Sequence, residues 1–326
     1  MNILWIKDGK KGHEKQVSVL LEELSKNINV SIYEEEFTLS KLKKALFLVD
    51  CVLLKLGSFL KKNYSFAAKL THKQRIDFKE REINIVIGAG SGPHIQLLKY
   101  KQEFNTKIIS VLTPAFFKER YDLICSPIHD NDKYKKSNNV IFFEGSLAKI
   151  SDEIPNNNLG FIGIGGKNRH FVFDQKKLLQ QIEYVISIYS NVHWEIFPSR
   201  RTPIEMVNKL KDLKLKYSNI KISSEDIDIK IKNASIKIVT QDSVNMVFEC
   251  LSTKGETYLF NMKYFKKNKI VNLMNRLCDN KQIGYIENLQ IVDGLNKIKM
   301  ISRNKHIGVF AEVEKVAYQL LKRISQ

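Results

Sequence analysis

The sequence predicts an α/β protein with two domains. Apolar, strand-like runs alternate with helical patterns along the whole chain, which is typical of layered α/β folds. At 326 residues the chain is long for a single hydrophobic core, so two domains of ordinary size are expected. Residues 144–158 interrupt the alternation and provide the best linker, after which strands and helices begin again. We therefore predict domains at residues 1–150 and 151–326, with a last helix over residues 311–324 that can cross back to the first domain.

Composition excludes several classes of protein. The chain is 43% hydrophobic and 27% charged, as in globular proteins, and no run of about 18 apolar residues predicts a membrane span. The start shows no pattern of a secretory signal, so we expect a cytoplasmic protein. The four cysteines are far apart and have no CxxC spacing, so they indicate reduced thiols and no metal site. We expect no cofactor either.

The net charge of +18 favours an anionic partner. Nucleic acid, anionic lipid and phosphorylated substrates all satisfy that condition. No nucleic-acid module with interleaved aromatic residues is recognisable, so nucleic acid is not the expected partner. The charge alone does not choose between the other two.

The first strand is predicted at residues 2–6 and leads into a glycine-bearing turn at residues 7–12. The helix that follows has apolar residues at helical spacing. Asp8, His13 and Glu14 then lie at the carboxyl end of the first strand, the edge where open α/β sheets bind ligands. A histidine there can act as a general base, and the two carboxylates are further catalytic candidates. The alternative is a polar loop with a glutamate that begins a helix.

A second glycine-bearing turn is predicted at the same edge. After a strand at residues 30–37, residues 83–87 form a buried strand that ends in the sequence GAGSGP, and a helix begins near His94. This turn includes Gly90 and Ser91 but lacks the GxGxxG spacing, so a dinucleotide site is not predicted. Short strands at residues 108–112 and 122–125 end at the same edge.

Residues 41–62 form an apolar stretch bracketed by lysines. Its length and interruptions argue against a membrane span, and its lysines suit a helix on an anionic membrane surface. A core helix followed by a loop is an equally good interpretation.

In the second half, three strand ends carry groups that suit phosphate. A strand at residues 159–164 is followed by the loop 165–169, which begins with a pair of glycines. A strand at residues 192–197 ends in a Ser-Arg-Arg sequence, and a strand at residues 235–240 leads into a helix whose N-cap is expected at the residue pair after Gln241. The residues concerned are Gly165, Gly166, Lys167, Ser199, Arg200, Arg201, Asp242 and Ser243. Free N–H groups and the helix dipole favour an anion at such a helix N-terminus.

Glu249 extends this hypothesis from phosphate to nucleotide. It lies on the same helical face as Asp242 and Met246, about 10 Å along the axis, since each residue rises about 1.5 Å. That is near the distance from a diphosphate to a ribose. The alternative is an ordinarily capped helix with a solvated glutamate. Further along, we expect a strand at residues 257–260 and a basic segment at residues 263–269.

With these residues identified, the chain resembles the bacterial members of the mitochondrial-fission Elm family, regarded as glycosyltransferases of the GT-B fold. Four short motifs carry the resemblance and follow the family's order over most of the chain. They are residues 8–16, the pair Gly165-Gly166, residues 199–203, and residues 240–249.

The resemblance implies two facing Rossmann-like domains with a central cleft. The first would bind the acceptor, on the side of Gly12, Gly90 and Ser91, and the second a nucleotide-sugar donor. Glu249 matches the glutamate that holds the ribose in related enzymes. Gly12-His13 is similar to a Gly-His sequence whose histidine serves as base.

We therefore predict an inverting, metal-independent glycosyltransferase of bacterial envelope synthesis, with a glycan or lipid-linked acceptor such as lipopolysaccharide. It would be cytoplasmic or peripheral on the inner face of the membrane. A nucleotide-sugar epimerase of GT-B architecture and a non-enzymatic scaffold at a membrane surface are the alternatives.

Overall fold

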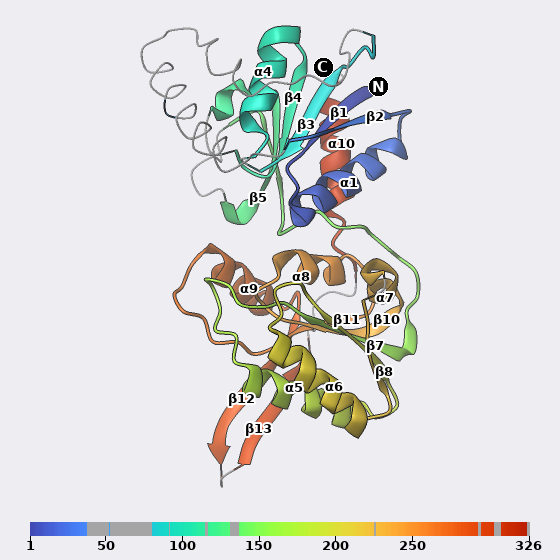
Figure 1. The fold of residues 1–326 in the computed structure, drawn as a ribbon, viewed down its shortest axis with the longest axis vertical. Coiled ribbons are helices and arrows are strands. Elements are labelled where there is room, and N and C mark those ends of the chain that lie inside the picture. The colour runs from blue at the N-terminus through green and yellow to red at the C-terminus, as the bar shows by residue number, and fades with distance from the viewer. Residues whose placement is uncertain are drawn as a thin grey trace. The chain divides into compact units, whose positions relative to one another are not determined.

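The computed structural model describes residues 1–37, 52, 80–90, 92–114, 117–130, 137–224, 226–292, 295–302 and 308–324 (Figure 1). The chain is divided into two compact units. Met1–Glu144 and Glu312–Gln326 form the first, and Gly145–Ala311 forms the second. The boundary thus lies at Glu144 rather than at residue 150, and the last helix, α10 (Glu312–Ile324), belongs to the first unit.

The first unit contains a parallel sheet of six strands in the order β2-β1-β3-β4-β5-β6. The order changes direction at β1, because the chain adds β2 on one side of it and β3 on the other. Ligands bind at such a switch point in open α/β sheets. The strands are β1 (Asn2–Lys7), β2 (Ser31–Glu36), β3 (Ile85–Ala89), β4 (Lys107–Val111), β5 (Leu123–Pro127) and β6 (Val140–Phe143).

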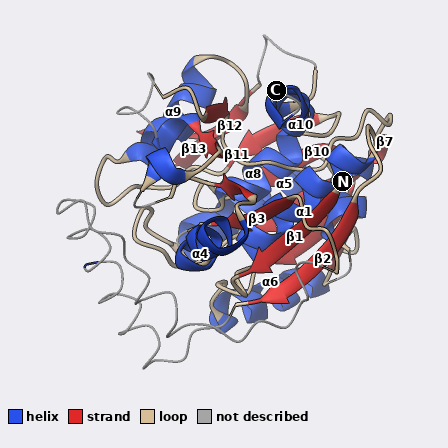
Figure 2. Ribbon diagram, turned by 90° about the horizontal axis from the view of Figure 1, so that it is seen from above, coloured by secondary structure: helices blue, strands red, loops and turns tan. Residues whose placement is uncertain are grey.

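Helices cover both faces of this sheet. Helix α1 (Lys11–Ser25) packs against α10 on one face, and α4 (His94–Phe104) covers the other (Figures 1 and 2). The apolar positions that predicted α1 are buried, which confirms the helical spacing. They are Val17, Leu20, Leu21 and Leu24. Two short 3₁₀ turns follow at Lys118–Arg120 and Ile128–Asp130.

The second unit contains a mixed sheet of seven strands in the order β13-β12-β11-β10-β7-β8-β9. Its order changes direction at β7, between β8 and β10, and only the edge pair β12 and β13 is antiparallel among the described strands. The strands are β7 (Asn156–Ile164), β8 (His193–Pro198), β9 (Ile220–Ile222), β10 (Ala234–Val239), β11 (Glu256–Leu259), β12 (Gly284–Val292) and β13 (Leu295–Ile301).

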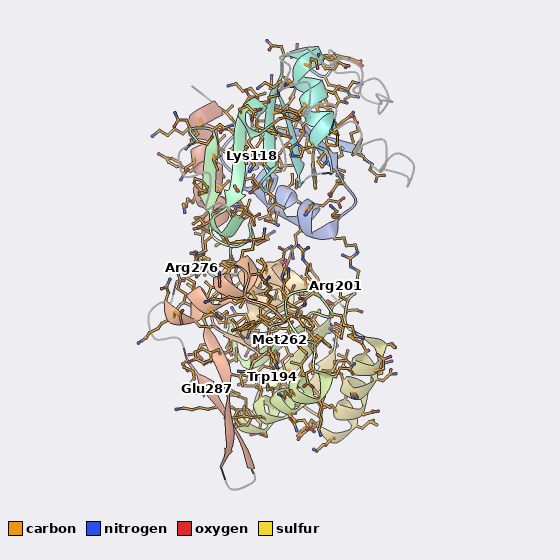
Figure 3. All side chains as sticks on the ribbon, turned by 90° about the vertical axis from the view of Figure 1, so that its left-hand side faces the viewer. Lys118, Trp194, Arg201, Met262, Arg276 and Glu287 are labelled. Carbon is orange, nitrogen blue, oxygen red and sulfur yellow. The ribbon has the colours of Figure 1, made fainter. Side chains whose placement is uncertain are left out.

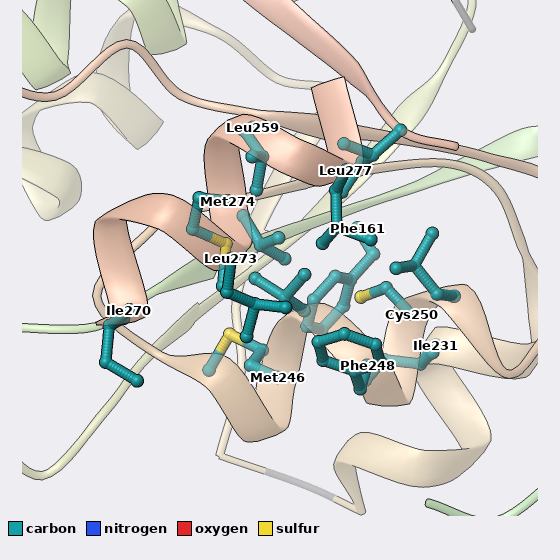
Figure 4. Close-up of a cluster of buried hydrophobic side chains, with 14 of the residues drawn as sticks. Phe161, Ile231, Met246, Phe248, Cys250, Leu259, Ile270, Leu273, Met274 and Leu277 are labelled. Carbon is teal, nitrogen blue, oxygen red and sulfur yellow. The ribbon is translucent and has the colours of Figure 1, made fainter. Parts of the chain in front are cut away.

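Two hydrophobic clusters sandwich this sheet. Along β10, Ile238 packs with α5 (Gln175–Ile188) and α6 (Ile204–Lys216), and Val239 packs in the cluster on the other face. The alternation follows from the period of two in a strand. The cluster that contains Val239 includes residues of α7 (Ile227–Asn233), α8 (Val244–Leu251) and α9 (Lys269–Asp279). Figure 4 shows side chains of this cluster.

Residues 145–158, expected as a linker, belong to the second unit. Ser146 Oγ donates to Asn245 Oδ1 at 3.0 Å, and the backbone N–H of Ser151 donates to Ser252 O at 3.1 Å. β7 already begins at Asn156, three residues before the expected start. None of the helices within the described ranges combines the length and apolar character that crossing a bilayer requires.

Candidate functional site

A carboxylate and an imidazole pair at the carboxyl end of β1. Asp8 directly follows the strand and His13 lies in the first turn of α1, with Asp8 Oδ2 at 2.9 Å from His13 Nδ1. The Asp8 side chain is 4% exposed and that of His13 is 26% exposed. Because the carboxylate accepts a proton held on Nδ1, the lone pair of a neutral imidazole lies on Nε2. This geometry suits a general base.

The surroundings keep Asp8 ionised. Burial by itself raises the pKa of the Asp8 carboxyl. The hydrogen bond to His13, the charge of His13 and the backbone N–H of Lys10 outweigh burial and hold this pKa below its usual value of 3.8. At neutral pH Asp8 therefore carries the charge that stabilises a protonated His13.

The glycine-rich turn after β3 makes room for this pair. A Cβ on Gly90, whose φ is +70°, would lie 2.4 Å from Cε1 of His13. A Cβ on Gly92 would lie 2.9 Å from Cβ of Asp8. Both approaches are closer than side-chain carbons tolerate, so the two glycines are needed for the pair to pack against the turn. Ser91, also predicted here, lies outside the described residues.

Glu14 and Gly12 have local structural contacts. Glu14 Oε1 accepts from the backbone N–H of Gly9 at 2.9 Å, which fixes the turn between β1 and α1. The carbonyl of Gly12 accepts from Gln16 Nε2 at 3.3 Å. Asp8, rather than Glu14, is thus the carboxylate that contacts His13.

In the second unit, the three predicted strand ends meet, because β10, β7 and β8 are adjacent in the sheet. Gly165 N donates to Thr240 Oγ1 at 2.7 Å, joining the end of β7 to that of β10. Ser199 N donates to Ile164 O at 2.8 Å, joining β8 to β7. The junction lies at the switch point of this sheet.

Asp242 organises the junction from a buried position. Its side chain has no exposed surface, and Oδ2 accepts from Gly166 N at 3.0 Å and from Arg201 Nη2 at 2.9 Å. Within the described part of the chain, its Oδ1 is buried without a hydrogen-bond partner. Ser243, not Asp242, is the N-cap residue of α8. Asp242 therefore positions Arg201, whose side chain is 45% exposed and retains donors for an anion. Arg201 is labelled in Figure 3.

Packing explains both glycines of the pair after β7. A Cβ on Gly165 would lie 2.2 Å from Asp242 Oδ1, and one on Gly166 would lie 1.9 Å from the carbonyl oxygen of Arg201. Only glycine allows the loop to lie this close to its neighbours. Lys167 and Arg200 are exposed beside this packed junction. Ser199 Oγ accepts from Arg201 N at 3.2 Å.

Met246 is part of the core. Its side chain is 7% exposed and packs in the cluster of Figure 4, and a Cβ on Gly163 would lie 2.2 Å from its sulfur. The side chain fills the space above Gly163 and leaves little surface for a ligand.

Glu249 lines a cavity of about 220 Å³. The walls come from residues 149–153, from α7 with its capping Asp226, and from the end of α8. Lys149 and Lys232 face the same space, and Lys232 Nζ bonds to Glu153 Oε1 at 2.8 Å. The half-buried Glu249 is therefore not a glutamate on an open helix face.

Sequence patterns alone did not indicate several of these residues. Thr202 Oγ1 donates to Gly165 O at 2.5 Å, and Thr240 Oγ1 accepts from Gly165 N. Both threonines lie inside the short motifs at residues 199–203 and 240–249. Gly92 stands in the glycine-rich turn. The cavity walls gave no signal, because three separate segments form them. Among the described residues, no group of three or more His, Cys, Asp or Glu side chains is arranged to hold a metal ion.

Comparison with known proteins assigns the family. The family model described as mitochondrial fission ELM1 matches residues 11–324. The chain belongs to this family. None of the curated proteins compared with the chain matches it.

Solved structures share the fold. The UDP-GlcNAc 2-epimerase of Methanocaldococcus jannaschii is 12% identical in sequence and superimposes with a TM-score of 0.52. The match covers 99% of this chain and 100% of that one. MurG of Acinetobacter baumannii is 10% identical with a TM-score of 0.50, covering 99% of this chain and 92% of that one. A UDP-N-acetylglucosamine 2-epimerase from Listeria monocytogenes, so described provisionally, is 8% identical with a TM-score of 0.51, covering 99% and 88%. The ELM1-family chain thus has the GT-B fold with two Rossmann-like domains, as the sequence predicted. The cleft between the domains stays a prediction.

Proposed function

We propose that this ELM1-family protein is a glycosyltransferase. It transfers a sugar from a nucleotide-sugar donor to a hydroxyl group of a bacterial envelope glycan or lipid-linked acceptor, with inversion and without a metal ion or cofactor. It acts in the cytoplasm, at the inner face of the membrane. The observation that carries the proposal is the Asp8–His13 pair at the switch point of the first sheet.

The first unit supplies the base. His13 Nε2 takes the proton of the acceptor hydroxyl, whose oxygen attacks the anomeric carbon of the donor sugar. The bond from that carbon to the nucleotide's terminal phosphate oxygen breaks at the same time, and the nucleotide leaves with the bonding electrons. Asp8 stabilises the imidazolium that forms, because its carboxylate is already ionised and in contact with Nδ1.

The second unit supplies groups for the donor. Arg201, held by Asp242, offers its remaining N–H donors to the leaving diphosphate, next to the N-terminus of α8. Glu249 accepts hydrogen bonds from the ribose hydroxyls in the cavity of about 220 Å³, which is the right order of size for part of a nucleotide. The two switch points thus divide base and donor binding between the units.

Two measurements test the proposal. Thermal unfolding is followed with UDP-, GDP-, ADP-, dTDP- and CMP-linked sugars, since a ligand at 100 times its Kd stabilises the fold by about 2.7 kcal/mol. Transfer of labelled sugar from the stabilising donor to an envelope-lipid extract is then compared for wild type and His13→Ala. We expect turnover to fall by roughly 10²–10⁴-fold with donor affinity unchanged. Full transfer by the variant would exclude His13 as base, and no stabilising donor at all would favour a scaffold.

An epimerase is the second candidate, because the fold is shared equally with UDP-GlcNAc 2-epimerases. In that reaction the Asp8–His13 pair would act on the donor sugar itself. An epimeric nucleotide sugar that appears without any acceptor would overturn the transferase proposal.

A further inference from the structure

In the second unit, the loop after β11 pairs with the loop after β7. Val172 N donates to Lys263 O at 2.7 Å, and Phe265 N donates to His170 O at 3.0 Å. Phe171 and Tyr264 form an antiparallel bridge between them. We call residues 263–267 the ribbon turn. It follows the carboxyl end of a strand, as the loop of Gly165 does, so both lie at the same edge of the sheet.

The ribbon turn is held in place from both sides. Phe171 is 1% exposed and belongs to the hydrophobic core. Asn168 Oδ1 accepts from the N–H groups of His170 and Phe171 at 2.6 and 3.0 Å. Asn268 caps α9 through Oδ1 and donates from Nδ2 to Lys266 O at 2.9 Å. The exposed side chains of the ribbon turn therefore extend from a backbone that these hydrogen bonds hold in place.

Those side chains are aromatic and basic. Phe265 is 64% exposed and Tyr264 is 45% exposed. Lys263, Lys266 and Lys267 are exposed beside them, and Lys167 and Arg169 are exposed on the facing loop. Neither residues 257–278 nor residues 159–173 contain an Asp or Glu. The positive charge of the two loops is thus not neutralised along their own segments.

The pKa of His170 is lowered by burial and by neighbouring positive charge. Burial lowers its pKa first, the charges of Arg169 and Lys269 lower it further, and the hydrogen bond to Asn268 does not compensate. Positive charges from the loop after β7 and from the start of α9 therefore act on His170.

We propose that the ribbon turn is a docking surface for an anionic lipid membrane. Lysines are attracted to the negative surface potential of anionic lipids, and an aromatic pair between them suits the boundary of headgroups and acyl chains. Single-stranded nucleic acid also binds lysines and aromatic rings, but it stacks successive bases along a groove or on a sheet. A two-ring tip on a short turn matches the lipid boundary better. The ribbon turn contains none of the residues proposed to act on the donor or the acceptor. It is also separate from residues 41–62, of which only Val52 is described.

The test measures flotation of the full chain with vesicles of phosphatidylcholine, with and without an equal part of phosphatidylglycerol. One variant combines Lys263→Glu, Lys266→Glu and Lys267→Glu, and a second combines Tyr264→Ser and Phe265→Ser. Controls with matched changes lie on α6, a different element of the second unit, whose lysines and two apolar residues are also exposed. The charge control combines Lys209→Glu, Lys211→Glu and Lys214→Glu, and the apolar control combines Ile204→Ser and Leu215→Ser.

We expect binding only to the vesicles with phosphatidylglycerol. The ribbon charge variant should lose affinity by at least about a hundredfold, given the contribution of each lysine near such a surface. The aromatic variant should lose about tenfold, and both α6 controls should bind nearly as wild type. The proposal is overturned if wild type does not bind, if the charge control loses as much as the ribbon variant, or if the aromatic variant binds normally. Tighter binding to a single-stranded oligonucleotide than to the vesicles, lost in the same ribbon variants, would also overturn it.

Discussion

Gly90 lies directly against the imidazole of His13. A methyl group at Gly90 would lie 2.4 Å from Cε1 and 2.7 Å from Nδ1 of the ring, so the turn after β3 and the first turn of α1 are fitted to each other. Gly92 stands in the same relation to Asp8. The glycines of this turn therefore give space to the side chains of the candidate site.

Gly90→Ala should displace His13 from Asp8 and lower turnover by more than tenfold, since a misplacement of about 1 Å can cost 10²-fold. Gly9→Ala is a matched control, because Gly9 has φ +74° and a Cβ there meets nothing within 4 Å. Both variants carry the backbone strain of a positive φ, which costs of order 1 kcal/mol. Equal losses of turnover in the two variants would mean that strain, and not contact with His13, causes the effect.

Asp8→Asn should leave His13 near its place but remove the charge that stabilises its protonated form. Turnover is expected to fall by about 10³–10⁴-fold, as when the carboxylate of a catalytic histidine is neutralised, while KM for the donor changes little. Crystallography or NMR of His13 shows whether the ring has moved. An unchanged rate would remove Asp8 from the mechanism.

The sequence predicted that the candidate site residues lie at the carboxyl ends of the strands, but the strand order that makes both places switch points came only from the structure. Strand and helix periodicity placed Asp8 and His13 at one edge, because parallel strands end together, and the structure brings them to 2.9 Å. The same logic placed Asp242 and Ser243 at the start of α8 and left the N-cap open between them, and the structure assigns it to Ser243. The contact with Gly166 and Arg201 depends on side-chain directions across three strands, which residue spacing does not encode.

The cavity at Glu249 shows the other limit. Its walls come from segments as distant as residues 149–153 and 226–232, so no local pattern could reveal it. Met246 was predicted to contact the donor because it shares a helical face with Asp242 and Glu249. In the structure its side chain is 7% exposed, so it belongs to the core.

Buried His94 predicts a pH dependence of stability. Burial, with a smaller effect of Lys118, lowers its pKa from 6.5 to about 4, and the ring contacts the Tyr121 hydroxyl. The unfolded chain therefore binds a proton at higher pH than the folded chain, and stability falls as pH drops from 6.5 to about 4. The loss attributable to this group is about 3 kcal/mol, at about 1.4 kcal/mol for each pKa unit.

His94→Asn keeps a polar atom near the position of Nδ1 and cannot titrate in this range. Urea unfolding of wild type and variant at pH 7 and pH 4.5 measures the difference. The variant should be less stable at pH 7 and should lose less stability on acidification. Parallel losses in both proteins would place the titrating group elsewhere.

Asp242→Asn should weaken the junction at the end of β7. The amide oxygen can still accept from Gly166 N, but the ion pair with Arg201 is lost, and a buried charged hydrogen bond contributes about 1.5–3 kcal/mol. We expect a lower urea midpoint and weaker donor binding. Arg201→Ala, alone and combined with Asp242→Asn, completes a double-mutant cycle, and additive effects on donor affinity would mean that Asp242 does not act through Arg201.

Glu249→Gln tests the ribose contact in the cavity. If Glu249 accepts hydrogen bonds from the ribose hydroxyls, loss of its charge should weaken donor binding by about 1.5–3 kcal/mol, which is roughly 10- to 150-fold. Glu153→Gln is the matched control, because Glu153 is a second carboxylate that lines the same cavity, where it pairs with Lys232. Wild type should also prefer the ribonucleotide over its 2′-deoxy analogue, and Glu249→Gln should lose most of that preference. Calorimetry with both nucleotides decides the matter, and an undiminished preference for the 2′-hydroxyl in a folded Glu249→Gln protein would place the ribose elsewhere.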